Sequence, residues 1–175
     1  MNVNIENSTG LEYTYLELEA MMKAYLETTV FNRYFEEGRE YSNETKLLFD
    51  KIAAGKIDGF VSLAVIEEME RLPDFMRTQL LSLIPKHNIK TLAMRETAFE
   101  LADVYVETGI IPASFLFDGL HIATAAICNM DCIISLNFRH INRWATKVET
   151  EIAHRMKGLG HLFICTPGEV LYDKE

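Results

Sequence analysis

Several features of other protein classes are missing from this sequence. Its 175 residues contain no apolar run that approaches the roughly 20 residues of a membrane span. Residues 1–10 are polar and lack a basic start, so no signal peptide is predicted. The motifs G-x-G-x-x-G and G-x-x-x-x-G-K-[ST] are also missing, which argues against an unrelated nucleotide-binding protein. We therefore expect a cytoplasmic protein with no membrane segment.

Cysteine is scarce, and its spacing suits neither a disulfide framework nor a metal site. Cys128, Cys132 and Cys165 are an odd number within apolar segments, which is typical of reduced, buried thiols. A zinc site at Cys128-x3-Cys132 would need a second Cys/His pair at ligand spacing, and the sequence has none. We therefore expect free thiols.

The sequence has fewer basic than acidic residues. Lys and Arg number 17 against 26 Asp and Glu, for a net charge of −9, which argues against a general nucleic-acid coat protein. A nuclease is not excluded, because bound metal neutralises a cluster of carboxylates. Residues 138–161 are an exception to the deficit, and this stretch is either a contact surface for an RNA backbone or a solvated helical face. The residues expected to contact RNA there are Arg139, Arg143 and Lys147.

Short apolar runs alternate with helical patterns along the chain. Strands are predicted at 23–26, 59–62, 89–92, 131–136 and 162–165. Helices are predicted at 31–35, 44–54, 63–72, 73–83, 95–107, 115–128 and 146–156, with a last turn from Pro167. This alternation predicts an α/β protein with a mainly parallel sheet. Ligands in such sheets bind beyond the carboxyl ends of the strands.

The helix boundaries and the domain limits can also be predicted. Helices are expected to be capped by Thr28 or Thr29, Ser42, Ser62 and Ser114, and Pro85 is expected to end the helix that begins at Pro73. Residues 1–21 are interpreted as an N-terminal extension, although Tyr15, Leu16, Leu18 and Met22 would also suit a short amphipathic helix. Residues 22–175 are interpreted as one domain.

Two glutamates follow predicted strands. Glu27 comes directly after strand 23–26, where the dipole of the next helix would also favour an acid. Glu68 lies six residues after Ser62, in a helix that Val65 and Met69 make largely apolar, and its neighbour Glu67 is an alternative that the residues alone leave open. A carboxylate on the inner side of such a helix needs a partner. Both are therefore candidates for a functional site beyond the strand ends, and solvated or dipole-favoured acids are the alternative.

Asp118 is the most informative acid, because helix 115–128 is almost wholly apolar. An unpaired buried carboxylate is costly, so either a cation pairs with Asp118 or the residue lies at the rim of a cleft. A first-turn acid favoured by the helix dipole is the alternative. His121, three residues on, is expected to orient Asp118 or to pack beneath the site. Asn137 stands at the end of the strand DCIISL (131–136), either as a turn residue or as a neutral positioner of water, phosphate or metal.

A cluster of hard oxygen ligands at one edge of a sheet suits Mg²⁺ or Mn²⁺. Four blocks of this chain also resemble PIN-domain proteins of the VapC-like toxin type, over Lys23 to Tyr172. The blocks are YLETTVFN (25–32), VSLAVIEE (61–68), DGLHIATA (118–125) and DCIISLNFRHI (131–141). Their order and spacing carry the resemblance, and the D-x-x-H-I-A-x-A block is the most specific.

The resemblance implies a three-layer α/β/α sandwich with a central mainly parallel sheet, and RNA cleavage that depends on Mg²⁺ or Mn²⁺. It implies metal ligation by Glu27, Glu68 and Asp118, with Asn137 as the fourth catalytic position. Thr28 and His121 would support the site. Many members of the family are toxins inhibited by a cognate antitoxin, and many are homodimers. Because the family usually has Asp where Glu27 and Asn137 stand, a non-catalytic PIN scaffold that binds RNA or protein is the alternative.

Overall fold

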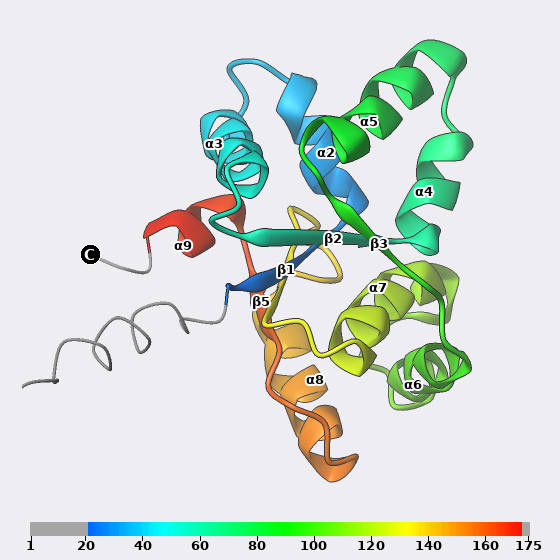
Figure 1. Cartoon of the computed structure of the whole chain (residues 1–175). Helices are drawn as coiled ribbons and strands as arrows, with labels where there is room; N and C mark the ends of the chain where they lie inside the picture. The colour runs from blue at the N-terminus through cyan, green and yellow to red at the C-terminus, as the bar shows by residue number, and fades with distance from the viewer. Residues whose placement is uncertain (1–20, 173–175) are drawn as a thin grey trace, which may run out of the picture.

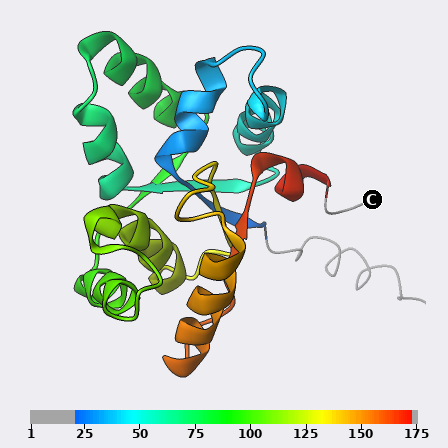
Figure 2. The same ribbon diagram turned by 180° about the vertical axis from the view of Figure 1, so that it is seen from behind.

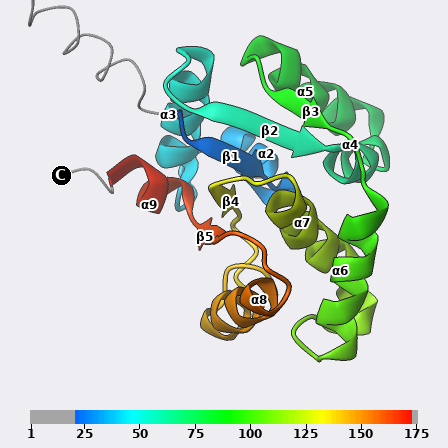
Figure 3. The same cartoon turned by 60° about the horizontal axis from the view of Figure 1, so that its bottom comes forward.

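The computed structural model describes residues 21–172. The proposed N-terminal extension, residues 1–21, therefore lies outside the described residues apart from Met21. The strands are β1 (Lys23–Leu26), β2 (Asp58–Ser62), β3 (Lys90–Leu92), β4 (Cys132–Ile134) and β5 (Phe163–Cys165). They form one sheet in the order β3-β2-β1-β4-β5 (Figure 3), and every neighbouring pair is parallel. The prediction of a mainly parallel sheet is confirmed.

Helices cover both faces of this sheet. They are α2 (Thr28–Phe35), α3 (Ser42–Ala53), α4 (Leu63–Glu70), α5 (Asp74–Lys86), α6 (Glu96–Glu107), α7 (Leu116–Ile127), α8 (Trp144–Met156) and α9 (Pro167–Tyr172), with a 3₁₀ turn η1 (Ala113–Phe115). Figures 1 and 2 show α2, α3 and α5 on one side of the sheet and α6, α7 and α8 on the other. The result is the expected three-layer α/β/α sandwich. No helix in the described range has the length and apolar character needed to cross a membrane.

The central strands are buried because both faces of the sheet are covered. All three residues of β4 are buried, and so are Tyr25 and Leu26 of β1. This burial matches the continuous apolar runs that predicted these strands. The three thiols are free, as expected, with Cys132 and Cys165 buried and Cys128 partly exposed.

The predicted helix caps were partly wrong. Glu27, rather than Thr28 or Thr29, is the N-cap of α2, because its carboxylate accepts a hydrogen bond from the Thr29 N–H at 3.2 Å. Ser42 is the first residue of α3, and the N-cap is Tyr41 with a left-handed φ of 65°. A carboxylate that reaches the first N–H groups of a helix competes directly with the neighbouring hydroxyls for the capping position.

Three further boundaries differ from prediction. Ser114 lies inside η1, and Phe115 is the N-cap of α7. Pro85 lies within α5, which continues to Lys86, because a proline one residue from the end of a helix removes only one backbone hydrogen bond. Strand β4 ends at Ile134 rather than at residue 136, so Asn137 lies three residues beyond the strand.

Candidate functional site

Polar side chains converge at the carboxyl end of β1, between β2 and β4. Ligand atoms of Glu27, Glu68 and His121 all lie within 4.8 Å of one another. The three residues come from the end of β1, from α4 and from α7. The parallel sheet explains the meeting, because the strand order β2-β1-β4 brings segments that are distant in sequence to one edge.

Glu27 is held by hydrogen bonds from neutral groups. Its carboxylate accepts from the Thr29 backbone N–H at 3.2 Å, from the Thr29 hydroxyl at 2.5 Å and from the Ser135 hydroxyl at 2.8 Å. The residue is only 4% exposed. Burial raises the pKa of Glu27, and this outweighs the lowering effects of His121 and of the Thr29 and Ser135 hydroxyls. The lowering effect of His121 is therefore smaller than the cost of burying the ionised Glu27 carboxylate.

Glu68 has the opposite electrostatic balance. Its Oε2 accepts a hydrogen bond from the Thr28 hydroxyl and lies 3.2 Å from Nε2 of His121. Burial pushes the pKa of Glu68 upward, but the hydrogen bonds and charge of His121, with Thr28 and Arg71, lower it overall. Glu68 is therefore the ionised member of the pair, and its side chain is 27% exposed, so its carboxylate is open to solvent.

His121 links Glu68 to a buried hydroxyl chain. Its Nδ1 lies 2.8 Å from the Tyr25 hydroxyl, which in turn lies 2.7 Å from the Ser62 hydroxyl. Burial lowers the pKa of His121, but the Glu68 carboxylate, with Glu27 and Asp118, raises it overall. Burial also raises the pKa of Tyr25, which keeps the phenol protonated. A protonated His121 can then donate to both Glu68 and Tyr25, and Tyr25 donates to Ser62.

Asp118 lies beside this cluster rather than within it. It occupies the first turn of α7, one turn before His121, and its Oδ2 lies 2.8 Å from Nδ1 of His140. Of the two roles expected for His121, orienting Asp118 or packing beneath the site, its contacts favour the second: the buried His121 pairs with Glu68, whereas His140 pairs with Asp118. The ring of His140 packs against the ring of Phe115, with centroids 3.7 Å apart. The guanidinium of Arg139 lies over the Phe115 ring, 5.6 Å from its centroid.

Asn137 forms a turn that connects the two halves of the site. Its side-chain oxygen accepts a hydrogen bond from the His140 N–H at 3.0 Å, and its own N–H donates to the Ser135 hydroxyl at 3.0 Å. Asn137 thus fixes Ser135, which holds Glu27, and His140, which holds Asp118. In this arrangement the side-chain oxygen of Asn137 already has a partner.

The three expected RNA contacts lie on the loop after β4 and on α8. Arg139 and Arg143 are exposed, whereas Lys147 is partly buried with its Nζ 4.0 Å from Glu169. Arg139 is the one tied to the site, through Phe115 and His140.

The resemblance named Thr28 and His121 as supporting residues but not five further participants. These are Tyr25, Thr29, Ser62, Ser135 and His140. Four of them carry a hydroxyl, a group too common in any sequence to mark a site. His140 could have been found from the sequence, because it stands three residues after Asn137. At this spacing an Asn side-chain oxygen can accept a hydrogen bond from a following backbone N–H.

No family model matches the sequence, and no curated protein does. Among solved structures, the chain is similar to the crystal structure of VapBC2 from Rickettsia felis bound to a DNA fragment from their promoter. The TM-score is 0.51 with 13% sequence identity, and the match covers 82% of this chain and 97% of that chain.

The chain has a PIN-like fold. This likeness agrees with the five parallel strands and the three layers, and with the architecture that the four sequence blocks implied. At 13% identity the likeness concerns the fold, so the chemistry depends on the residues described above.

Proposed function

We propose that this protein is an endoribonuclease that uses Mg²⁺ or Mn²⁺ to hydrolyse phosphodiester bonds in RNA. The observation that carries the proposal is the convergence of Glu27, Glu68 and His121 within 4.8 Å. Asp118 stands one turn from His121 on the same helix. None of these three acids has a Lys or Arg ion pair among the described residues. Acids gathered at a sheet edge without a Lys or Arg ion pair are a candidate site for a metal ion.

The donor set fits a hard divalent cation. The candidate ligands are carboxylate oxygens of Glu27, Glu68 and Asp118, and oxygen ligands favour Mg²⁺ and Mn²⁺ over softer metals. The raised pKa of Glu27 reflects burial that His121 and the hydrogen bonds from Thr29 and Ser135 do not offset, and a bound cation would lower this pKa. Such a cation would supply a bound water of lowered pKa and would stabilise charge that develops on the phosphate.

The remaining residues hold the carboxylates in place. Thr28 and His121 both bind Glu68 Oε2, and the other oxygen of Glu68 has no hydrogen bond from the described residues. The hydroxyls of Thr29 and Ser135 bind Glu27 Oε2, and the Thr29 N–H binds Oε1. Hydrogen-bonded ligands of this kind keep their orientation when a metal or substrate arrives. His140 performs this role for Asp118.

The location of positive charge supports a nucleic-acid substrate. Arg139 lies over Phe115, which also packs against the His140 ring that holds Asp118. Arg143 follows four residues later and is exposed. Arginines beside a metal site suit phosphate oxygens, which give affinity without sequence information. RNA rather than DNA, and a cytoplasmic setting, follow from the resemblance of the sequence blocks.

We also infer a protein partner. The similar solved structure is a VapBC2 complex bound to promoter DNA, so we propose that the chain is the toxin of a toxin–antitoxin pair and forms a homodimer. Expression of the chain alone should arrest growth, and co-expression with its antitoxin, to be sought as a small protein encoded next to its gene, should restore growth. Growth that is unaffected by an active enzyme would contradict the toxin role without affecting the nuclease assignment.

The nuclease proposal is tested with a pair of neighbouring glutamates. A fluorescently labelled RNA is incubated with wild type, Glu68→Gln and Glu67→Gln in Mn²⁺ and in EDTA. Glu67 is exposed and 3.9 Å from Arg71, so its substitution controls for a change of charge on α4. We expect Mn²⁺-dependent cleavage in wild type and Glu67→Gln and none in Glu68→Gln. Cleavage that survives in Glu68→Gln, or that persists in EDTA, would disprove the proposed metal site.

One observation favours a second candidate function. The Asn137 oxygen is bonded to a backbone N–H, and Asp118 is bonded to His140, which leaves few free oxygens at the site. A non-catalytic PIN scaffold that binds RNA or protein would have this property. Calorimetric titration with Mn²⁺ separates the two functions: no heat at millimolar metal would support the scaffold, and binding together with RNA cleavage would exclude it.

A further inference from the structure

Two arginine–phenylalanine pairs lie next to the candidate metal ligands. The Cζ atom of Arg71 lies over the ring of Phe117, 5.3 Å from its centroid, and that of Arg139 lies over the ring of Phe115 at 5.6 Å. Both phenylalanines stand within three residues of Asp118. Arg139 is among the residues expected to contact an RNA backbone, whereas neither the metal site nor the phosphate contacts use Arg71 and Phe117. An arginine placed over an aromatic ring has its planar guanidinium partly ordered before any ligand arrives.

Arg71 lies beside the acidic cluster. It is the C-cap of α4, one turn after Glu68, and α4 packs beside α7 (Figure 1). Burial acts to raise the pKa of Glu68, but His121 and the charge of Arg71 are among the groups that lower it. The guanidinium is therefore close enough to act on this carboxylate. Phe117 directly precedes Asp118 in the first turn of α7, so the pair bridges the two helices that carry these acids.

The strand order separates the two pairs. Arg71 belongs to the segment that follows β2, and Arg139 belongs to the segment that follows β4. Strand β1, with Glu27 at its end, lies between these two strands. RNA with a phosphate over the carboxylates therefore has an arginine on either side.

Arg71 and Phe117 are both open to solvent. The side chain of Arg71 is 65% exposed, and Phe117 is 37% exposed. The ion pair of Arg71 with Glu67 spans 3.9 Å, and a pair this long between exposed groups holds an arginine only weakly. Most of the Arg71 side chain is therefore available to a planar ligand.

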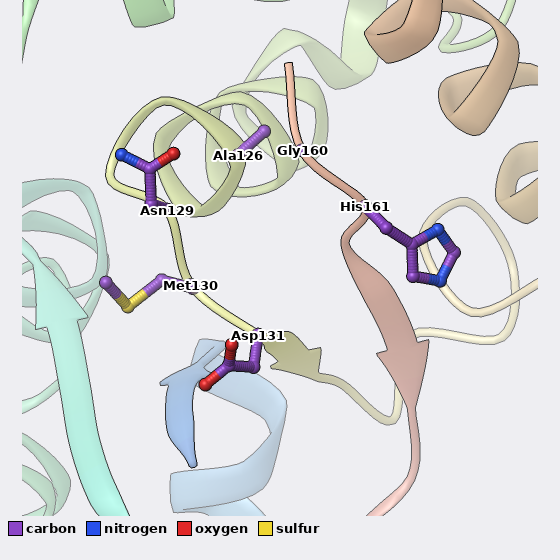
Figure 4. Close-up of a pocket in the computed structure, with 6 residues that line it drawn as sticks. All are labelled: Ala126, Asn129, Met130, Asp131, Gly160 and His161. Atoms are coloured by element: carbon purple, nitrogen blue, oxygen red, sulfur yellow. The ribbon is translucent and has the colours of Figure 1, made fainter. Parts of the chain in front are cut away.

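The hollow shown in Figure 4 is not part of this region. It has a volume of about 200 Å³ and is lined by Ala126, Asn129, Met130, Asp131, Gly160 and His161. Because Asp131 precedes β4 and His161 precedes β5, the hollow lies at the amino end of the sheet, opposite the acidic cluster. A base beside the acidic cluster is therefore bound by exposed groups rather than by this hollow.

We propose that Arg71 and Phe117 form a subsite on which one unpaired base of the RNA stacks, next to the phosphate that is cleaved. The inference rests on the proposed nuclease function. Aromatic rings and guanidinium planes are the groups on which proteins stack unpaired bases, and such a contact accepts any base because every base has a flat face. A nucleotide suits both members of the pair, because its base is planar and its phosphate is negative.

The subsite is tested with two RNAs of equal charge. One is a labelled oligouridylate of about ten nucleotides, and the other is a chemically stable analogue of the same chain without bases. Fluorescence anisotropy in Ca²⁺ gives the affinity of the full chain for each. We expect wild type to bind the RNA with bases about tenfold more tightly, which is the size of effect of one stacked base. Arg71→Lys keeps the charge but loses the plane, and Phe117→Leu keeps an apolar side chain but loses the ring, so each should remove most of this difference.

Two substitutions on α5 provide matched controls. Arg77 is paired with Asp74 at 2.9 Å, and Phe75 is exposed, so both resemble the tested residues but belong to another helix. Arg77→Lys and Phe75→Leu should leave the ratio of the two affinities unchanged. Circular dichroism of all four variants checks the fold.

Three results would overturn the subsite. A wild-type ratio near one would leave the pair to a protein partner. A ratio in Arg71→Lys equal to that of wild type would mean that another surface stacks the bases. An equal loss of affinity for both RNAs in Arg71→Lys would assign Arg71 to phosphate instead. Cleavage is not measured in this assay, so the nuclease proposal is judged separately, by the Mn²⁺-dependent activity of wild type and Glu68→Gln.

Discussion

Acidic residues lie at both ends of the same sheet, in opposite electrical surroundings. At the amino end, Asp58 lies 2.7 Å from Nζ of Lys90, and Asp131 accepts from the backbone N–H of Lys23. At the carboxyl end, Glu27 and Glu68 are held by hydroxyls and a histidine. An acid at a strand end is therefore not diagnostic by itself. What distinguishes the carboxyl end is that Glu27 and Glu68 converge there with His121, with ligand atoms within 4.8 Å of one another, and that neither acid has a Lys or Arg ion pair among the described residues.

The largest expected difference between the two ends is catalytic. Asp118→Asn should reduce Mn²⁺-dependent RNA cleavage by about 10²–10³-fold, the size of effect seen when one electrostatic group of an active site is lost. The matched change Asp131→Asn should leave the rate within about twofold, because residues at the opposite end of the sheet are outside the site. Circular dichroism of both variants checks the fold. Equal losses in the two variants would remove the distinction between the ends.

Metal binding should stabilise the protein through the carboxyl end alone. A cation at a hundred times its Kd adds about 2.7 kcal/mol to the free energy of unfolding. For a chain of this size that is about 5–10 °C in Tm. We expect this rise for wild type and Asp58→Asn in a Mn²⁺ titration followed by thermal unfolding. The double variant Glu27→Gln/Glu68→Gln should show no rise, and an unchanged response in that variant would place the metal elsewhere.

Without metal, Glu27 should destabilise the fold at high pH. Burial raises the pKa of Glu27 above its unfolded value, so its contribution to stability is fully present below the unfolded pKa and is lost as the pH rises through the folded pKa. In EDTA at pH 8, Glu27→Gln should therefore be more stable than wild type and unfold at a higher Tm.

The pH dependence provides the control for this prediction. The advantage of Glu27→Gln should shrink as the pH falls towards the ordinary carboxyl range of about 4, where wild type binds the same proton in both states. Asp58→Asn, at the amino end, should show no such gain at pH 8. A gain for Glu27→Gln that is constant from pH 5 to pH 8 would mean that packing rather than charge causes it.

The smallest expected difference concerns RNA affinity. Arg143→Ala should weaken RNA binding in the presence of Ca²⁺ by a few-fold and reduce the slope of log K against log salt by about one, as the loss of one phosphate contact does. Lys90→Ala, which removes a cation already paired with Asp58, should change neither quantity. Fluorescence anisotropy over a range of salt concentrations measures both. An equal change in the two variants would mean that the effect is one of net charge.

Most of the architecture could be predicted because its signals are local. The apolar run around β4 and the Gly-Phe-Val-Ser run of β2 each reported a strand through residues next to one another. The boundaries were harder, as the caps of α2 and α3 show, because a glutamate side chain and a left-handed tyrosine occupied positions expected for hydroxyl residues. Which residue caps a helix depends on which side chain can reach the free backbone N–H groups in space, and this leaves no periodic pattern in the sequence.

The residues of the site show the same difference between local and long-range information. The sequence by itself determined that Glu27 and Glu68 follow parallel strands and that Asp118 opens an apolar helix, because strand ends and helix faces are properties of neighbouring residues. Only the tertiary structure decided that His121 serves Glu68 and that His140 serves Asp118. It likewise decided that Ser135 holds Glu27 across 108 residues of sequence. Those pairings follow from the order β2-β1-β4, which sets which distant segments meet at the carboxyl edge of the sheet.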